Sequence, residues 1–405
     1  MDLCATSRSV LALRPCWVEI NSRALEDNYR LLRSLAGPAT ECLAIVKANA
    51  YGHGLEICAP AAVSAGARWL GVTSAEEGAA ARAVCPDARL VIMGGVFRGQ
   101  GPEVIASNLT AVVWDRLQLD ELERAAAGVG TSSVPVHLEI DTGMSRQGVS
   151  LDDLPGLLAR FTPMSPLRLE AVMTHLYASD DSIGHTTPAQ LERLEQALGI
   201  VRAHPALPPE FLSVGASAAL LGGETGQIGA LAARFDLRPM VRLGLALYGV
   251  APRFCPPFAA GDEPAALSRA IDGLEPVLAW KTRVTSLLSI PAGTEVGYNG
   301  TFLATESMRL ALLPLGYADG LDRRLSNRFS LLVGGRRAPL VGRISMDQAV
   351  LDITDIAGVK PGDEVVILGG QGGERITAYD HADACETIPW EVFTRIAQRN
   401  ARAAV

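Results

Sequence analysis

The chain has 405 residues, of which 48% are hydrophobic, and its net charge at neutral pH is -8. This length and apolar content predict two or three domains with buried cores, which excludes a disordered chain and a disulfide-held miniprotein. The acidic balance argues against nucleic acid as the main partner. Only three lysines occur, Lys47, Lys281 and Lys360, against 33 arginines. Chemistry that needs a primary amine therefore has three candidates.

The compartment is indicated by the cysteines and by the apolar runs. Seven cysteines are widely spread with no C-x-x-C pair, which is typical of a reducing compartment and argues against zinc or disulfide frameworks. No run approaches the ~18 apolar residues of a membrane helix, and Val10–Leu13 is too short for a signal-peptide core. We predict a soluble, cytoplasmic protein without a membrane partner, in which residues 1–16 are loosely ordered.

Short apolar runs alternate with helical patterns from residue 40 onward. The strand-like runs are Cys42–Val46, Trp69–Thr73, Leu90–Met93, Leu109–Trp114, Val134–Ile140, Leu169–Thr174, Phe211–Val214 and Val241–Leu245. Helical periodicity occurs over Leu55–Ala65, Ala75–Val84, Leu117–Ala127, Leu151–Phe161 and Pro188–His204. Runs that are apolar on both faces indicate parallel strands covered by helices. The eight β/α units predict a (β/α)8 TIM barrel over residues 17–250 rather than an open doubly wound sheet.

The pattern changes after the eighth run. A proline-rich stretch predicts a linker over residues 251–271. Beyond it, short β-type runs are separated by turn signals such as Asn299-Gly300 and Gly334-Gly335, and only Ile388–Ala401 has a helical pattern. A C-terminal, mainly-β domain is therefore predicted over residues 272–405.

Polar residues follow several of the predicted barrel strands, where the active sites of (β/α)8 enzymes form. Lys47 directly follows the first run. Burial would lower the pKa of its amine and make it nucleophilic, although a lone strand-end lysine more often reaches solvent. Small residues at Ser217 and Gly244, near the last two strands, would let backbone N–H groups approach a phosphate. A reactive lysine opposite a phosphate site is the arrangement that pyridoxal phosphate enzymes need.

Seven segments extend this prediction, namely VKANAYGHG (46–54), DTGMSRQG (141–148), THLYASD (174–180), VRLGLALYG (241–249), VGYNGTF (296–302), LGYADGLDRRL (315–325) and VGRISMDQ (341–348). With these motifs in this order, the sequence resembles the alanine racemases, which are fold-type III pyridoxal phosphate racemases. The resemblance runs from about Trp17 to the C-terminus. It implies pyridoxal 5'-phosphate as cofactor, a small amino acid as substrate, and a head-to-tail homodimer with composite active sites.

The resemblance also implies roles for individual residues. Lys47 would form the Schiff base with the cofactor and act as the base on one face of the substrate Cα, while Tyr298 of the other subunit would serve the opposite face. Arg242 would contact the pyridine nitrogen. The other implied cofactor contacts are Tyr51, His175, Ser217, Gly244 and Leu245. Substrate contacts would come from Arg146 and the backbone of Met346, and the residues implied along the substrate access path are Asp180, Tyr317, Arg323, Arg343 and Ile396.

Three positions depart from the family pattern. Glu139 stands where many members carry a carbamylated lysine, and we interpret it as a built-in anion that accepts hydrogen bonds from Arg146. Gln398 stands where a tyrosine is frequent, and Ala216 replaces an asparagine. Alanine is the favoured substrate, and these departures leave serine or a larger amino acid as the alternative. A same-fold decarboxylase and a non-catalytic pyridoxal phosphate-binding protein are further alternatives, although single-barrel carriers lack a second β domain.

Overall fold

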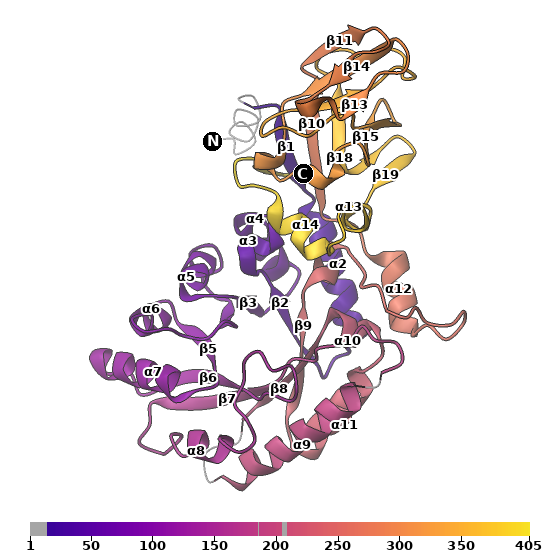
Figure 1. Cartoon of the computed structure of the whole chain (residues 1–405). Helices are drawn as coiled ribbons and strands as arrows, with labels where there is room; N and C mark the ends of the chain where they lie inside the picture. The colour runs from indigo at the N-terminus through magenta and orange to yellow at the C-terminus, as the bar shows by residue number, and fades with distance from the viewer. Residues whose placement is uncertain (1–13, 185, 205–208) are drawn as a thin grey trace. The chain divides into compact units, whose positions relative to one another are not determined.

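The structure is a computed structural model that describes residues 14–184, 186–204 and 209–405. The chain divides into two compact units (Figure 1). The barrel unit comprises Arg23–Ala50 and Cys58–Glu275. The β unit comprises the described part of Met1–Ser22 together with Tyr51–Ile57 and Pro276–Val405. The segment after Lys47 therefore passes from one unit to the other within the VKANAYGHG motif.

Eight parallel strands close into a barrel, in which each strand pairs with its neighbour in sequence and β9 pairs back with β2. The strands are β2 (Glu41–Ile45), β3 (Trp69–Val72), β4 (Arg89–Ile92), β5 (Leu109–Val113), β6 (Val134–Glu139), β7 (Leu167–Met173), β8 (Phe211–Ala216) and β9 (Arg238–Leu243). Each overlaps one predicted run. The predicted TIM barrel is confirmed, and the two-sided burial of its strands explains why they are almost continuously apolar.

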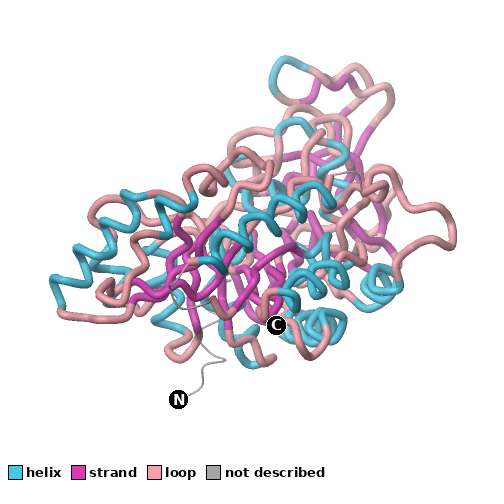
Figure 2. Tube along the Cα trace, turned by 90° about the horizontal axis from the view of Figure 1, so that it is seen from below, coloured by secondary structure: helices cyan, strands magenta, loops and turns pink. Residues whose placement is uncertain are grey.

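Helices lie outside these strands, as Figure 2 shows with helices in cyan and strands in magenta. They are α2 (Ser22–Ala36), α3 (Lys47–Tyr51), α4 (Leu55–Ser64), α5 (Ala75–Val84), α6 (Gly101–Ala106), α7 (Arg116–Val129), α8 (Leu154–Leu158), α9 (Thr187–Ala203), α10 (Ser217–Leu221), α11 (Thr225–Arg234), η1 (Leu245–Tyr248) and α12 (Ala265–Gly273). Local sequence fixes several ends. Asp115 and Gln118 form a capping box on α7, and Gly130, at φ 70°, ends it. The predicted linker is corrected, because α12 begins within it and ends two residues beyond it.

The first strand corrects the predicted start of the barrel. Strand β1 (Cys16–Ile20) pairs antiparallel with β10 (Leu278–Arg283) and parallel with β20 (Ala401–Ala404), so residues 17–20 belong to the β unit. An apolar run shows that a strand forms but not which distant strand it joins. Of the segment predicted to be loosely ordered, residues 1–13 lie outside the described residues, and Arg14 forms an ion pair with the buried carboxylate of Asp319.

The β unit contains three sheets. The largest has the order β16-β15-β18-β10-β1-β20, with β19 added at β18, and smaller sheets join β11, β14 and β17, and β12 and β13. Their bounds are β11 (Ser286–Ile290), β12 (Glu295–Val296), β13 (Phe302–Leu303), β14 (Met308–Leu313), β15 (Ser330–Val333), β16 (Arg336–Pro339), β17 (Ala349–Asp352), β18 (Glu364–Gln371) and β19 (Glu374–Ile376). The mainly-β prediction is confirmed.

Short helices interrupt these strands: η2 (Tyr298–Gly300), η3 (Tyr317–Asp319), η4 (Arg323–Leu325), α13 (Ala378–Ala384) and α14 (Pro389–Arg395). The helix predicted over Ile388–Ala401 therefore ends six residues early, and α13 was not predicted. Throughout the described ranges, we find no helix with the length and apolar content needed to cross a membrane.

A buried ion cluster stabilises the barrel. The fully buried carboxylate of Glu170, on β7, accepts hydrogen bonds from Arg89, Arg168 and His137. Burial by itself raises the pKa of this carboxyl, but the hydrogen bond from His137 and the two guanidinium groups outweigh it and lower the pKa from 4.5 to about 2. Because the folded-state pKa lies below the unfolded one, the stabilisation is complete above about pH 4.5 and is lost as pH falls toward 2.

We therefore expect Glu170→Gln to lower the free energy of unfolding at neutral pH by about 2 kcal/mol, since three donors lose a charged acceptor. Urea unfolding followed by circular dichroism measures this loss, and the difference from wild type should shrink as pH falls below 4.5. Glu210→Gln is the control, because Glu210 is half exposed in its ion pair with Arg238 and should change stability by less than about 0.5 kcal/mol. Equal losses in both variants would contradict the buried cluster's role.

Candidate functional site

Lys47 lies two residues after the end of β2, at the C-terminal end of the barrel strands, and its side chain is half-buried. Burial lowers the pKa of its amine, and the positive charges of Arg146 and Arg242 lower it further, while the carboxylate of Glu77 acts in the opposite direction. A larger fraction of the amine is therefore neutral than in a solvent-exposed lysine, and a neutral amine is the nucleophilic form. Lys281 differs, since ion pairs with Glu19 and Glu364 raise its pKa despite partial burial.

The backbone after Lys47 is left-handed. Ala48, Asn49 and Ala50 have φ values of 51°, 54° and 54° with ψ near 50°, and Tyr51 continues at φ 52°. A left-handed residue that carries a Cβ costs about 1–2 kcal/mol, and such residues normally occur singly. This turn is therefore a strained segment that the surrounding structure must hold, and such strain is concentrated at functional sites.

Arg242 connects the last three barrel strands from the interior. Its buried guanidinium donates from Nη1 to the carbonyl and hydroxyl oxygens of Ser213 and from Nη2 to the carbonyl oxygen of Thr174, at 3.0–3.1 Å. Nη2 also lies 2.9 Å from Nδ1 of His175. Because arginine can only donate, Nδ1 is the acceptor and the proton of the imidazole is on Nε2.

The imidazole of His175 is neutral over the physiological range. Burial lowers its pKa most, and the charges of Arg242, Arg146 and Lys47 add to this, which brings the pKa to about 3. A neutral ring with an Nε2–H donor can lie beside a heteroaromatic cofactor without adding charge. The strand ends thus bring together the amine of Lys47, the guanidinium of Arg242 and the neutral imidazole of His175. The charges of the first two groups act on the pKa of the third.

Two loops after the last barrel strands contain the residues that we predict to bind a phosphate. The hydroxyl oxygen of Ser217, at the start of α10, accepts from the backbone N–H groups of Gly244 and Ala246 at 3.1 and 3.4 Å. Leu245 begins η1 between them. Gly215, the residue before the end of β8, has φ 77°, and a Cβ added there would lie 2.8 Å from that of Ala219. This region fits a phosphate, because small residues bring hydroxyl and N–H donors together where barrel enzymes bind one.

The contacts of Glu139 differ from our interpretation that this carboxylate accepts hydrogen bonds from Arg146. Its buried carboxylate accepts a hydrogen bond from Nε2 of Gln147, which also donates to the carbonyl oxygen of Met93 at 3.2 Å. Among the described residues, no hydrogen bond or ion pair joins Glu139 to Arg146, whose side chain is exposed. Burial raises the pKa of Glu139, and the Gln147 hydrogen bond and the charges of Arg242 and Arg146 oppose this. Glu139 therefore acts on Arg146 only through its charge, since Gln147 occupies the carboxylate.

Gln190 was not predicted, although it connects two loops of the site. This buried side chain on α9 accepts from the backbone of Tyr177 at 3.1 Å and donates to the hydroxyl of Thr142 at 2.9 Å and the carbonyl of His175 at 3.1 Å. It thereby fixes the loop that carries Arg146 to the loop that carries His175. A glutamine inside a helical pattern gives no sequence signal for such a contact.

The remaining predicted residues lie in the β unit, apart from Asp180, which is exposed in the barrel unit. Tyr298 is 67% exposed and Met346 is 54% exposed, whereas Tyr51 is buried. Tyr51 lies beside Gly52, whose carbonyl accepts two hydrogen bonds from Arg402. A Cβ on Gly52 would come within 2.3 Å of the carbonyl oxygen of Phe393, so the motif needs glycine there.

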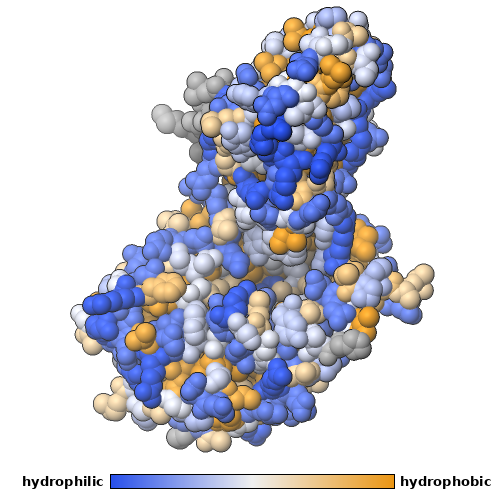
Figure 3. All heavy atoms as spheres, in the orientation of Figure 1, coloured by the Kyte–Doolittle hydropathy of each residue, from blue (hydrophilic) through white to orange (hydrophobic). Residues whose placement is uncertain are grey.

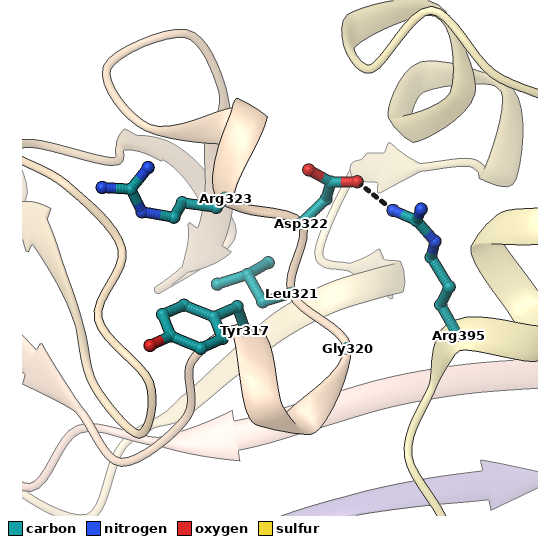
Figure 4. A pocket seen from close by; sticks show the side chains of 6 residues that line it. All are labelled: Tyr317, Gly320, Leu321, Asp322, Arg323 and Arg395. Atoms are coloured by element: carbon teal, nitrogen blue, oxygen red, sulfur yellow. Dashed lines mark hydrogen bonds and ion pairs between the residues drawn. The ribbon is translucent and has the colours of Figure 1, made fainter.

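Tyr317 and Arg323 line a cavity of about 650 Å³ in the β unit. Its wall is completed by Gly320, Leu321, Asp322 and Arg395. Figure 4 shows the two predicted residues on one side and the ion pair between Asp322 and Arg395 on the other. In the same unit Ile396 is buried, Arg343 is half-buried and Gln398 is exposed.

Comparison with known proteins covers both units. Residues 20–252 match the family described as alanine racemase, N-terminal domain, and residues 277–404 match alanine racemase, C-terminal domain. The alanine racemase of Symbiobacterium thermophilum is 36% identical, with 96% of each chain covered. The crystal structure of alanine racemase from Streptomyces lavendulae superposes with a TM-score of 0.85 at 32% identity, covering 97% of each chain. That from Bartonella henselae, described with covalently bound pyridoxal phosphate, gives 0.80 at 28%, covering 96% and 99%.

Proposed function

Because the chain belongs to the alanine racemase family, we propose that it interconverts L- and D-alanine with pyridoxal 5'-phosphate as cofactor and with Lys47 and Tyr298 as its two bases. The observation that carries the proposal is the half-buried Lys47, whose amine has a lowered pKa and lies at the barrel strand ends with Arg242 and His175. The enzyme class, an isomerase of the racemase type, follows from the family.

The residues of the barrel unit fit the cofactor. Lys47 offers the amine that the cofactor's aldehyde requires, and Arg242 and His175 offer neighbours for its ring. Near Gly244 and Leu245, the Ser217 hydroxyl accepts the N–H of Gly244 and keeps its own O–H as a donor for the phosphate. When bound, pyridoxal phosphate stabilises the negative charge that develops on Cα when a proton is removed. Arg242 cannot readily give up its proton, so it leaves the ring nitrogen unprotonated and moderates this stabilisation, which disfavours side reactions.

Inversion at Cα needs proton transfer on both faces. Lys47 takes or returns the proton on one face as an amine of lowered pKa. Tyr298, as a phenol, does so on the opposite face. The positive charge of Arg146 attracts the substrate carboxylate, and the backbone N–H of Met346 supplies a second contact to it. The two bases come from different units of the fold, which agrees with a site assembled from two subunits.

A head-to-tail homodimer is part of the proposal. Tyr298 and Met346 are both more than half exposed, although catalysis requires them inside a closed site. Leu288 and Leu303 of the same unit are exposed as well. Figure 3 shows orange, hydrophobic patches on the part of the β unit that contains β11 and β14. Exposed apolar groups of this kind are typical of surfaces that a partner covers.

The six cysteines of the described ranges are all free, and only Cys255 is exposed. This supports a reducing compartment, and we propose the cytoplasm.

The direct test is chiral analysis of the products from a panel of L- and D-amino acids, with the cofactor spectrum recorded in parallel. We expect visible absorbance from bound pyridoxal phosphate and the highest kcat/KM with alanine. A clear preference for serine or a larger amino acid would instead support the alternative substrate, which Glu139 and Gln398 favour because both differ from the usual family residues. Release of carbon dioxide would indicate a decarboxylase, and cofactor binding without turnover would indicate a carrier.

A further inference from the structure

One carboxylate holds the left-handed turn after Lys47 in place by a hydrogen bond. Glu77, in the first turn of α5, accepts the backbone N–H of Ala48 at Oε1 and that of Thr73 at Oε2, both at 2.8 Å. Ala48 is the first residue of the left-handed turn, and Thr73 directly follows β3. A single side chain therefore connects the backbone next to Lys47 to the end of the neighbouring barrel strand through two charge-assisted hydrogen bonds.

The sequence around Glu77 predicts a different contact. Ser74-Ala75-Glu76-Glu77 has the S-x-x-E pattern of a capping box, in which the glutamate accepts the N–H of the serine. The serine half forms, since the Ser74 hydroxyl accepts the N–H of Glu77 at 3.4 Å. The glutamate half does not, because its carboxylate accepts from Thr73, one residue earlier, and from Ala48 instead. Glu77 thus contributes to the site rather than to the full capping of its own helix.

Charge gives a second link between Glu77 and the amine. The charged groups that act on Lys47 are Arg146, from the loop after β6, Arg242, on β9, and Glu77, on α5. The two arginines lower the pKa of the amine and Glu77 raises it, while burial lowers it most. Glu77 is the one carboxylate of this set. Removing its charge should therefore make Lys47 a weaker base, in addition to any effect of the lost hydrogen bonds on the position of the turn.

We propose that Glu77 is a positioning residue for the reaction. Its carboxylate holds the strained turn that orients Lys47, and its negative charge opposes the effect of Arg146 and Arg242 on the pKa of the Lys47 amine. The proposal rests on the proposed function of Lys47. It predicts that geometry and charge can be separated by two variants. Glu77→Gln keeps one acceptor oxygen but loses the charge, and Glu77→Asp keeps the charge but is too short to reach both N–H groups.

The matched control is Glu76→Gln. Glu76 is the neighbouring residue in the same helical turn, is exposed, and accepts a hydrogen bond from Gln100 at 3.2 Å rather than from the turn after Lys47. Substitution at either position removes one negative charge from the N-terminus of α5, so any effect through the helix dipole is common to both.

Activity is measured first, on the holoenzyme with alanine. Glu77→Gln and Glu77→Asp should each lower kcat by about tenfold with little change in KM, because the turn and the amine shift relative to the substrate. Glu76→Gln should keep the wild-type kcat. Unchanged kcat in both Glu77 variants would overturn the proposal.

The second readout does not depend on turnover. Pulsed labelling with an amine-reactive reagent, followed by peptide mass spectrometry over a range of pH, gives the titration midpoint of Lys47 in the full-length protein prepared without cofactor. Exposed Lys360 serves as the internal reference. The midpoint of Lys47 should fall in Glu77→Gln and stay near the wild-type value in Glu77→Asp and in Glu76→Gln.

These outcomes separate the two hypotheses. A lower melting temperature with unchanged kcat and unchanged Lys47 midpoint would show that Glu77 only stabilises the fold, and the proposal would be wrong. Wild type could also fail to racemise any amino acid while the Lys47 midpoint still depended on Glu77. The proposed function would then be wrong, but the effect of the Glu77 charge on the pKa of Lys47 would be confirmed.

Discussion

Replacing Lys47 by alanine is expected to abolish racemisation, with a fall in kcat of about a thousandfold or more, and to remove the visible absorbance of the linked cofactor. Both losses follow from one cause in the proposed mechanism, in which the same amine attaches the cofactor and moves a proton at Cα. Lys47→Arg should be as inactive as Lys47→Ala, since a guanidinium remains protonated and does not attack an aldehyde. Chiral chromatography and an absorbance spectrum of the purified variants measure the two effects.

The scarcity of lysine makes the control simple. Lys281 is held in ion pairs and Lys360 is exposed in a turn, so Lys360→Ala should keep both the absorbance and the rate within about twofold of wild type. Melting temperatures should be compared, because loss of a linked cofactor also lowers stability through mass action. If Lys47→Ala kept its absorbance, the cofactor would be attached to a different amine and the assignment would be wrong.

The barrel could be predicted because its signals are local. Each strand is a short run that is apolar on both faces, and the polar residue that follows it marks the end of the strand where sites form. Lys47 follows β2 in this way, and the scarcity of lysine leaves few alternatives. Capping patterns such as Asp115 with Gln118 fix helix starts in the same local manner. Composition and pattern were therefore enough to predict that Lys47 lies near the C-terminal end of a barrel strand.

What could not be predicted depends on partners that are distant in sequence. Strand β1 joins the β unit because its partners are β10 and β20, and nothing within Cys16–Ile20 specifies them. The sequence pattern predicts that Glu77 forms half of a capping box, and only folding brings the backbone N–H of Ala48 to its carboxylate. Glu139 was expected to pair with Arg146, but the side chain that reaches it is Gln147, the next residue along. Neighbours in sequence can face opposite directions, and a motif does not show which one turns inward.

Tyr298→Phe is expected to bind the cofactor normally and to racemise alanine about a hundredfold more slowly, because the phenol proton is lost while the ring and its packing remain. Racemisation has the same equilibrium in both directions by symmetry, so kcat/KM must fall equally for L- and D-alanine. The asymmetry should appear in isotope exchange. In deuterated water, the enantiomer whose proton faces Lys47 should still take up deuterium, and the other should do so much more slowly.

Mixing variants tests whether Tyr298 acts on the site of its own chain or on that of the partner. If Lys47→Ala and Tyr298→Phe chains are dissociated and reassociated in equal amounts, about half of the dimers should contain one of each. In a head-to-tail dimer with composite sites, each mixed dimer has one site with both substitutions and one site with neither. The mixture should then recover about a quarter of the wild-type activity.

If each site were instead built from a single chain, every site in the mixture would carry a substitution, and its activity would not exceed the average of the two parents. The mixed dimer therefore measures where Tyr298 acts, independently of how much it contributes. This distinction matters because Tyr298 is 67% exposed on its own chain, where an exposed phenol would exchange its proton with water rather than with a substrate. Recovery of activity would mean that a partner subunit provides the enclosure that a second base needs.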